Sequence, residues 1–149
     1  MNLEPIGTIR NDVEEHGRRD WQNIVSEIVI DDEFLEALDH IEEFSHIIIL
    51  YWMHKLDQSQ RSVLKVHPRG QQDLPLVGVF SSRSPARPNP IGMTVVRLIG
   101  RENNILKVAG TDALNGTPVL DIKPYIPSHD AKDNAKTPQW VKHYPKQTT

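Results

Sequence analysis

Hydrophobic and polar residues alternate with a period close to two along much of the chain, a pattern typical of β-strands. This pattern predicts short strands at residues 6–10, 24–30, 47–53, 77–81, 94–98, 105–109 and 119–123. Residues 47–53 are apolar throughout, so we expect that strand to be buried on both faces. Glycine and proline separate the predicted strands, as is usual where turns interrupt a sheet.

One segment departs from this period. Residues 31–44 place Phe34, Leu35, Leu38 and Ile41 at helical spacing behind three acidic residues, which predicts one amphipathic helix. Many short strands with a single helix are typical of a mainly β protein, and we expect a small closed β-barrel. The barrel domain is predicted at residues 1–127, and residues 128–149 form a polar C-terminal tail without periodicity.

Composition narrows the chemistry. The 149 residues, 17.0 kDa, suit one globular domain, and the absence of cysteine excludes disulfides, thiolate metal sites and a cysteine nucleophile. Residues 1–15 are polar and acidic, so we expect no signal peptide. The longest apolar run has seven residues, too few to span a membrane. A cytoplasmic protein with no membrane contact is expected.

The net charge of −3 conceals an uneven distribution. Residues 1–60 carry −10, residues 61–101 carry +6, and residues 102–149 carry +1. A basic middle segment favours an anionic partner or ligand. The alternative is that these bases pair with the acidic first part of the fold.

The most unusual segment is residues 81–92, which read SSRSPARPNPIG. Its three prolines restrict the backbone to extended conformations, so Arg83 and Arg87 would lose little entropy on gripping a carboxylate or phosphate. We expect Gly92 to let the chain turn into the next strand. A stiff connection whose arginines pair with the acidic part is the alternative interpretation.

A second dense segment, residues 110–125, contains the turn signal Asn115-Gly116. Asp112 can accept hydrogen bonds from an amine or a ribose hydroxyl. The alternative is a plain hairpin in which Asp112 caps the turn.

The seven histidines form no HxH or HExxH pattern, so no metal site is predicted. His54 follows an apolar strand and can face a pocket, although a surface position is common for such a residue. No GxGxxG, P-loop or GxSxG motif is present.

Four blocks together resemble a known family. Residues 78–93, GVFSSRSPARPNPIGM, are similar to the signature of the TsaA-like β-barrel family, whose best-known members are the TrmO-type tRNA methyltransferases. The opening IGTIR, the segment from Phe44-Ser45-His46 to His54, and the block from Asp112 to Tyr125 also match. The resemblance extends from about residue 4 to residue 127.

The resemblance implies a homodimeric β-barrel that binds S-adenosylmethionine near the subunit interface. It implies N6-methylation of threonylcarbamoyladenosine at position 37 of tRNA, in the anticodon loop. Cofactor contacts would fall on His54, Lys55, Arg83, Met93, Asp112, Ala113, Leu114 and Asn115. A further contact in the family's first loop corresponds to no assignable residue among 18–22.

Two departures from the family pattern matter. Asn115 stands where the family usually has aspartate, so a neutral amide replaces a carboxylate. Longer members also carry a C-terminal domain, and we expect any tRNA grip supplied there to come from the barrel, the dimer or residues 128–149.

Methyl transfer needs aligned reactants and, because N6 is a poor nucleophile, an acceptor for its proton. His54 or Asp112 can serve as this catalytic group, and the sequence does not choose between them. Arg83 suits the methionyl carboxylate or a phosphate, backbone groups near Ala113 and Leu114 suit the adenine edge, and the substrate-binding candidates are Arg87, Asn89 and Tyr125.

Two other functions fit the same residues. One is a methyltransferase acting on a small metabolite or another RNA. The other is a non-catalytic barrel that binds RNA or a nucleotide, although aromatic residues do not interleave with the basic ones as stacking platforms would.

Overall fold

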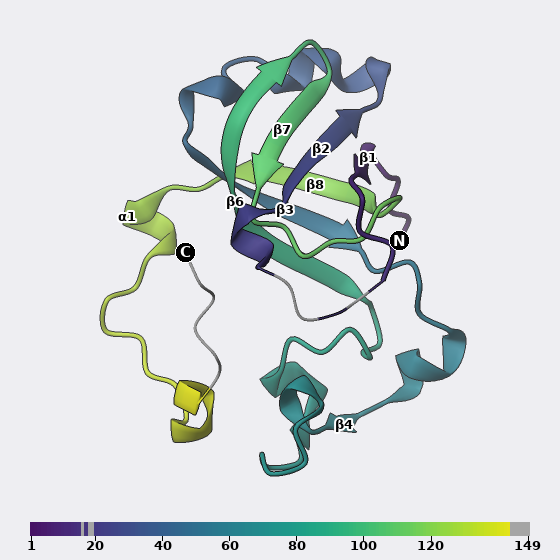
Figure 1. The fold of residues 1–149 in the computed structure, drawn as a ribbon, viewed down its shortest axis with the longest axis vertical. Helices are drawn as coiled ribbons and strands as arrows, with labels where there is room; N and C mark the ends of the chain where they lie inside the picture. The colour runs from purple at the N-terminus through teal and green to yellow at the C-terminus, as the bar shows by residue number, and fades with distance from the viewer. Residues whose placement is uncertain (16, 18–19, 144–149) are drawn as a thin grey trace.

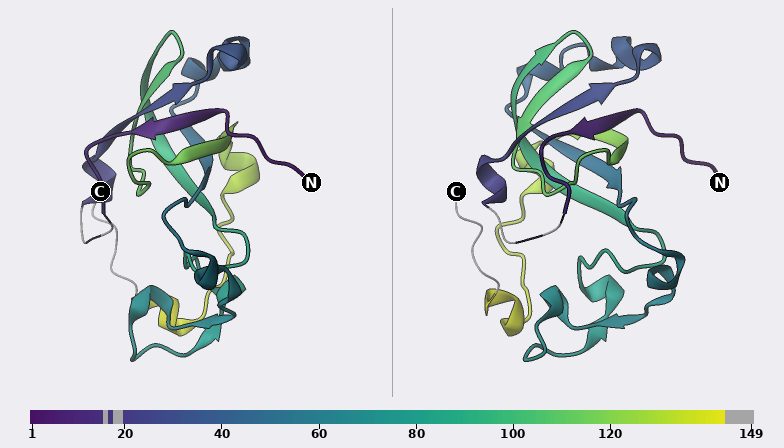
Figure 2. Two further views of the ribbon diagram at one scale, coloured as in Figure 1. Left: turned by 90° about the vertical axis from the view of Figure 1, so that its right-hand side faces the viewer. Right: turned by 45° about the vertical axis from the view of Figure 1, so that its right-hand side comes forward.

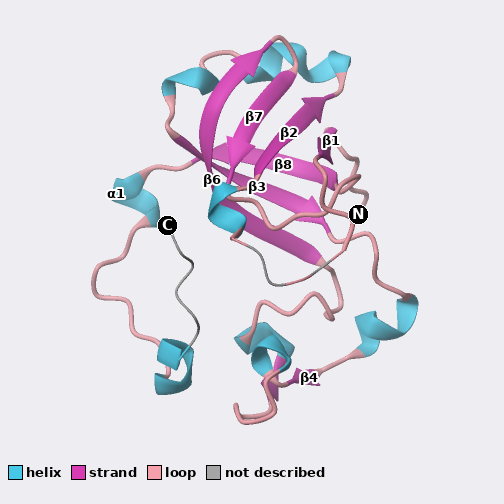
Figure 3. Ribbon diagram, in the orientation of Figure 1, coloured by secondary structure: helices cyan, strands magenta, loops and turns pink. Residues whose placement is uncertain are grey.

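The chain folds as a closed β-barrel. The computed structural model describes residues 1–15, 17 and 20–143, and in this part six antiparallel strands close into a barrel (Figures 1 and 3). The strands are β1 (Gly7–Arg10), β2 (Val25–Ile30), β3 (His46–Trp52), β6 (Ile91–Glu102), β7 (Ile105–Ala109) and β8 (Pro118–Pro124). Their order around the barrel is β1-β2-β7-β6-β3-β8. The predicted mainly β barrel is confirmed.

The chain between β3 and β6 lies outside the barrel. A two-stranded sheet of β4 (Lys65–Val66) and β5 (Val77–Gly78), together with the 3-10 helices η4 (Gln58–Ser62), η5 (Pro68–Gly70) and η6 (Val79–Ser81), forms what we term the β4–β5 lobe, residues 57–81. The proline loop, residues 82–90, leads from this lobe to β6. Figure 2 shows the lobe projecting beyond one end of the barrel.

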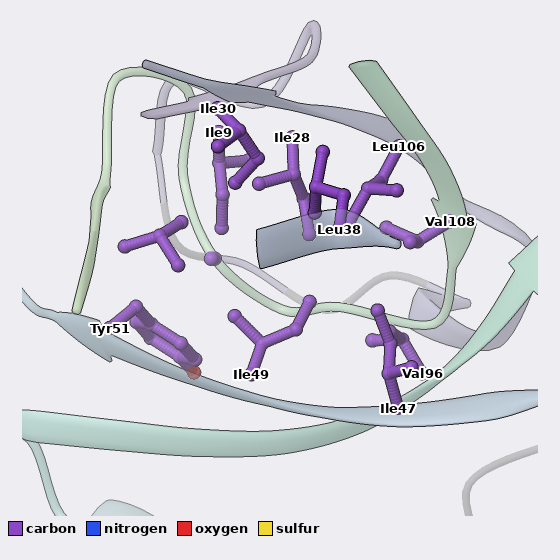
Figure 4. Close-up of a cluster of buried hydrophobic side chains, with 12 residues drawn as sticks. Ile9, Ile28, Ile30, Leu38, Ile47, Ile49, Tyr51, Val96, Leu106 and Val108 are labelled. Atoms are coloured by element: carbon purple, nitrogen blue, oxygen red, sulfur yellow. The ribbon is translucent and has the colours of Figure 1, made fainter. Parts of the chain in front are cut away.

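The core is built from inward-facing residues of all six strands (Figure 4). Alternate residues of each strand point inward, as the pleat of a strand requires. The buried cluster consists of Ile9, Ile28, Ile30, Leu38, Ile47, Ile49, Tyr51, Val96, Leu106, Val108, Ala113 and Val119. Leu38 comes from outside the barrel strands and is 4% exposed.

The expectation that residues 47–53 are buried on both faces is wrong. Ile47, Ile49 and Tyr51 point into the core, whereas the alternate residues Ile48, Leu50 and Trp52 are only half-buried. The reason is that β3 lies between β6 and β8 in the single curved layer of the barrel wall, so only its inner face contacts the core.

The segment 31–44 has the predicted apolar face but not the predicted continuous helix. It forms two 3-10 helices, η2 (Asp32–Leu38) and η3 (Ile41–Glu43), separated by His40 at φ 70°. The Arg101 guanidinium donates hydrogen bonds to the Leu38 carbonyl at 3.1 Å and to the Glu42 carboxylate at 3.3 Å. Arg101 thus donates to a carbonyl that would accept a backbone N–H if the helix continued.

The structure also differs from the predicted strand at residues 77–81 and from the alternative hairpin at Asn115-Gly116. Only Val77 and Gly78 of residues 77–81 are in a strand, because Val79–Ser81 turns into η6. The Asn115-Gly116 turn does not join neighbouring strands, since β7 and β8 are not adjacent in the barrel. The Asn115 N–H donates instead to the Val13 carbonyl at 2.7 Å, so this turn packs on the chain after β1.

The remaining elements are short. They are η1 (Trp21–Asn23), α1 (Pro127–Asp130) and η7 (Gln139–His143). Among the described residues, no helix has the length and apolar character needed to cross a lipid bilayer.

Candidate functional site

Asp112 is held in place from the barrel interior. Its Oδ1 accepts hydrogen bonds from the Tyr51 hydroxyl at 2.7 Å and the Thr94 hydroxyl at 3.1 Å. The alternative in which Asp112 caps the turn is not seen. The neighbouring Thr111 makes such a local bond instead, because its Oγ1 accepts from the Ala113 N–H at 3.1 Å. Asp112 is exposed, so its carboxylate is oriented from inside and open to solvent on the other side.

Tyr51 reaches Asp112 by lying across Gly92. These two residues face each other in the β3–β6 pairing, and a Cβ on residue 92 would lie 2.4 Å from two carbons of the Tyr51 ring. Gly92 therefore provides close cross-strand packing in the strand, where the sequence suggested a turn. Burial and the charge of Asp112 raise the pKa of Tyr51, so its hydroxyl stays protonated and donates.

Asn115 ties the first loop to the segment after Asp112. Its Oδ1 accepts from the Asn11 N–H at 3.1 Å, and its Nδ2 donates to Glu14 Oε1 at 3.0 Å. An aspartate here would lack the donor and would place a second carboxylate against Glu14. The amide thus fits the local structure better than the usual carboxylate would.

His54 and Lys55 join the same cluster. Lys55 Nζ donates to the Glu14 carbonyl at 2.7 Å and lies 3.7 Å from the Glu14 carboxylate. A Cβ on Gly116 would lie 3.8 Å from His54 Nε2, which places the imidazole beside the 115–116 turn. Desolvation and the charge of Lys55 lower the pKa of His54 from its ordinary 6.5, so the ring is neutral at pH 7.

Ala113 and Leu114 are available only through their backbone. Their side chains are buried, at 3% and 5% exposure. The Ala113 carbonyl accepts from Asn11 Nδ2 at 3.0 Å, and the Leu114 carbonyl accepts from Thr117 Oγ1 at 2.6 Å. Both carbonyls are therefore engaged within the fold, which limits how this segment can read a ligand.

The proline loop is braced by its own arginine. Arg87 Nη1 donates to the Ser82 carbonyl at 3.1 Å and to the Ser84 carbonyl at 3.0 Å. The alternative in which this arginine pairs with the acidic first part is not seen. Arg87 instead holds the loop's shape.

Arg61 is a loop-positioning residue that the sequence analysis missed. Its Nε donates to the Pro88 carbonyl at 2.8 Å, and its Nη2 lies 3.5 Å from Asn89 Oδ1. The guanidinium also lies over the Trp52 ring, 5.5 Å from the ring centre. A usable signal was the capping box of η4, in which Asp57 and Gln60 fix the start of the helix that carries Arg61.

The remaining candidates lie apart from this cluster. Arg83 is exposed and, within the described part of the chain, has no hydrogen-bond or ion-pair partner. Met93 is 48% exposed on the outer face of β6, whereas its neighbour Thr94 bonds Asp112 from the inner side. Tyr125 packs edge-on against His46, about 20 Å along β3 from Trp52. Residues 18–19 of the first loop lie outside the described residues.

Two hollows on the surface do not contain these residues. One of about 340 Å³ is lined by Glu27, Gly100, Arg101, Glu102, Ile105 and Lys107, and one of about 210 Å³ lies beside η3. No cluster of three or more potential metal ligands occurs among residues 1–15, 17 and 20–143. The candidate site is an open surface on one copy of the chain.

Known proteins resemble this chain over most of its length. The family profile described as the tRNA-methyltransferase O N-terminal domain matches residues 15–131. An S-adenosyl-L-methionine-binding protein of Archaeoglobus fulgidus is 46% identical over 136 residues, covering 87% of this chain and 93% of the relative. A tRNA (adenine(37)-N6)-methyltransferase of Mus musculus is 45% identical over 98 residues, covering 66% of this chain and 22% of the mouse protein.

Solved structures have the same fold. The crystal structure of TrmO from Pseudomonas aeruginosa superposes with a TM-score of 0.73 at 35% identity over 91% of this chain. This chain spans about 60% of the length of that solved chain.

Proposed function

Because the chain belongs to the tRNA-methyltransferase O N-terminal domain family, we propose that it is an S-adenosylmethionine-dependent methyltransferase acting on N6 of adenosine 37 in tRNA. The more specific substrate is the threonylcarbamoyl form of that adenosine. The observation that carries the proposal is the oriented carboxylate of Asp112, which is held from inside by Tyr51 and faces solvent near the end of the barrel.

The exposed residues suit the chemical groups of S-adenosylmethionine. The unpaired guanidinium of Arg83 matches a carboxylate, and the free oxygen of Asp112 matches an ammonium group or ribose hydroxyls. The exposed Met93 thioether offers an apolar, polarisable surface to an adenine ring. When bound, the cofactor supplies an electrophilic methyl group on a sulfonium.

The chain's own residues position the substrate and accept a proton. His54 is neutral at pH 7, so its unprotonated ring nitrogen would accept the N6 proton as the bond from N6 to the methyl carbon forms and the bond from that carbon to sulfur breaks. The Asp112 carboxylate orients its partner through the oxygen that Tyr51 and Thr94 leave free. Lys55 and Asn115 hold the first loop beside His54.

The substrate side of the site is the proline loop. Asn89 is exposed, with its side-chain oxygen 3.5 Å from Arg61, while Arg61 and Arg87 fix the backbone that precedes it. A preorganised loop loses little entropy when it binds, so these two arginines contribute to tRNA binding through rigidity. Tyr125 would contact a more distant part of the tRNA.

We further propose that the protein is a homodimer formed through the outer face of β3 and β6. On β6, the exposed fractions are 38% for Ile91, 48% for Met93, 41% for Val95 and 42% for Ile99. Ile48, Leu50 and Trp52 of β3 lie next to them and are half-buried. A solvated strand face normally carries polar residues, and apolar rows on neighbouring strands suit a self-complementary contact.

The position of Met93 gives this dimer a role in catalysis. One copy of the chain places Met93 and Asp112 on opposite sides of β6. A second copy on this face would bring its own Met93 to the boundary between the two copies. The cofactor would then lie near the boundary between the two copies, where each copy covers a surface that is open to solvent in the single chain.

The substrate is tested by methyl incorporation from radiolabelled S-adenosylmethionine into two matched tRNAs. We expect incorporation into tRNA that carries the threonylcarbamoyl group and none into tRNA that lacks it. Equal incorporation into both would contradict the proposed specificity. Cofactor binding without transfer to either tRNA would favour a small-molecule substrate or a non-catalytic barrel.

The cofactor role of Arg83 is tested by calorimetry on Arg83→Ala. Loss of a charge-assisted, two-pronged contact to a carboxylate should weaken S-adenosylmethionine binding by at least about tenfold. Lys107→Ala, which removes an exposed cation from β7, should bind as the parent protein does. Unchanged affinity in Arg83→Ala would remove Arg83 from the cofactor site.

The role of His54 predicts a specific pH dependence. Because the pKa of His54 lies below its ordinary 6.5, kcat/KM should rise as the pH increases through the pKa of His54 and level off before pH 7. His54→Gln should lower kcat by about a hundredfold and abolish this acid limb. His129→Gln, on α1, should keep the parent profile. Persistence of the limb in His54→Gln would assign it to another group.

The dimer is tested by light scattering during gel filtration. Val95→Glu should convert a dimer into a monomer, because a buried, unpaired carboxylate at the contact is unfavourable. Thr8→Glu places the same charge on β1, across the barrel from β6, and should leave the dimer intact. A monomeric parent protein, or a dimeric Val95→Glu variant, would refute this interface.

A further inference from the structure

The β4–β5 lobe presents three large apolar side chains to solvent. The exposed fractions are 81% for Phe80, 71% for Leu64 and 55% for Leu76. Phe80 has the largest value among the aromatic residues that the structure describes as exposed, since Phe44 reaches only 37%. An aromatic ring so fully exposed is unfavourable in water, which points to an interaction surface.

The backbone at Phe80 is held in place by its neighbours. Val79, the preceding residue, is 2% exposed, and its N–H donates to the Leu64 carbonyl at 3.0 Å. The Ser82 N–H and Ser82 Oγ both donate to the Val79 carbonyl, at 3.1 and 2.9 Å. The ring therefore projects from a fixed 3-10 turn, and presenting it to a partner requires little further ordering.

The chain on either side of this turn carries more bases than acids. Residues 57–90 contain five lysines and arginines but only two acids. Lys65 lies opposite Gly78 in the β4–β5 pairing, and Gly78 is two residues before Phe80 in the chain. Arg83 is three residues after Phe80. Within the described residues neither cation has a hydrogen-bond or ion-pair partner. Cations beside an exposed ring match the phosphates and bases of single-stranded nucleic acid.

Three other aromatic rings of the barrel already have a covering contact. Tyr51 is 5% exposed inside the barrel, and the Arg61 guanidinium lies over Trp52. Tyr125 packs against His46. Enzymes that modify a base in an RNA loop must hold it out of its stack, and proteins commonly do so by stacking aromatic rings on bases.

We propose that Phe80 is a stacking platform for an unpaired base of the RNA loop, with Lys65 and Arg83 beside it facing the backbone phosphates. This inference rests on the proposed RNA substrate but concerns binding, separately from methyl transfer. It amends the sequence-based view that aromatic and basic residues do not interleave. Arg83 is close to Phe80 in the sequence, but Lys65 is brought near Phe80 only by the β4–β5 pairing, which the sequence pattern does not show.

The test uses the full chain and a fluorescein-labelled anticodon stem–loop RNA, with binding followed by fluorescence anisotropy in the absence of cofactor. Phe80→Ala should weaken RNA binding by about tenfold, the loss typical of one base–aromatic stack. Phe80→Leu should lose nearly as much, because it keeps apolar area but has no aromatic face. Phe80→Trp should bind at least as tightly as the parent protein.

Leu76→Ala is the matched control, since it removes an exposed apolar side chain from the same lobe and should leave RNA affinity unchanged. Parent-like binding by Phe80→Leu would overturn stacking, as would a parent protein that does not bind the RNA. If the Phe80→Ala variant has a lower native mass than the parent protein, the Phe80 ring contacts a second copy of the chain and the stacking proposal is wrong. Weaker S-adenosylmethionine binding in that variant, with unchanged RNA binding, would assign it to the cofactor.

Failure of the proposed function has a different signature. In that case the parent protein would bind the stem–loop in a Phe80-dependent manner but transfer no methyl group to tRNA. The two results are therefore separable.

Discussion

The packing of the Tyr51 ring against Gly92 connects the barrel to its candidate site. Any side chain at residue 92 would occupy the space of the ring, so β3 and β6 can approach only around a glycine. The buried ring then carries its hydroxyl to Asp112, 61 positions away in the chain. One cross-strand contact thus closes the core and orients the carboxylate, which explains why an exposed acid has a defined direction.

The two faces of β6 separate the chemistry of the site. Gly92 and Thr94 face inward with Asp112, while Met93 and Val95 face outward in an apolar row. A pleated strand cannot present neighbouring residues to the same side. A site that uses both Met93 and Asp112 therefore cannot lie on one face of β6 alone.

The basic middle of the chain divides its arginines between structure and binding. Arg61 and Arg87 donate to carbonyls of the proline loop, and Arg101 donates to the end of η2. Arg83 is left unpaired among the described residues. The local charge of +6 thus overstates the cations available to an anionic ligand, yet Lys65 and Arg83 remain on either side of the turn that carries Phe80. The net charge of −3 is compatible with RNA binding at one restricted surface.

The sequence by itself determined the barrel and the family, because strand alternation is local and the signature of residues 78–93 is contiguous. Tertiary structure alone decided that Tyr51 orients Asp112, that Arg87 braces its loop, and that the segment 31–44 breaks at His40. These outcomes depend mostly on partners far apart in sequence, or on the direction in which a long side chain points. No local pattern specifies which distant carbonyl a guanidinium will reach, so only the folded chain could assign these roles.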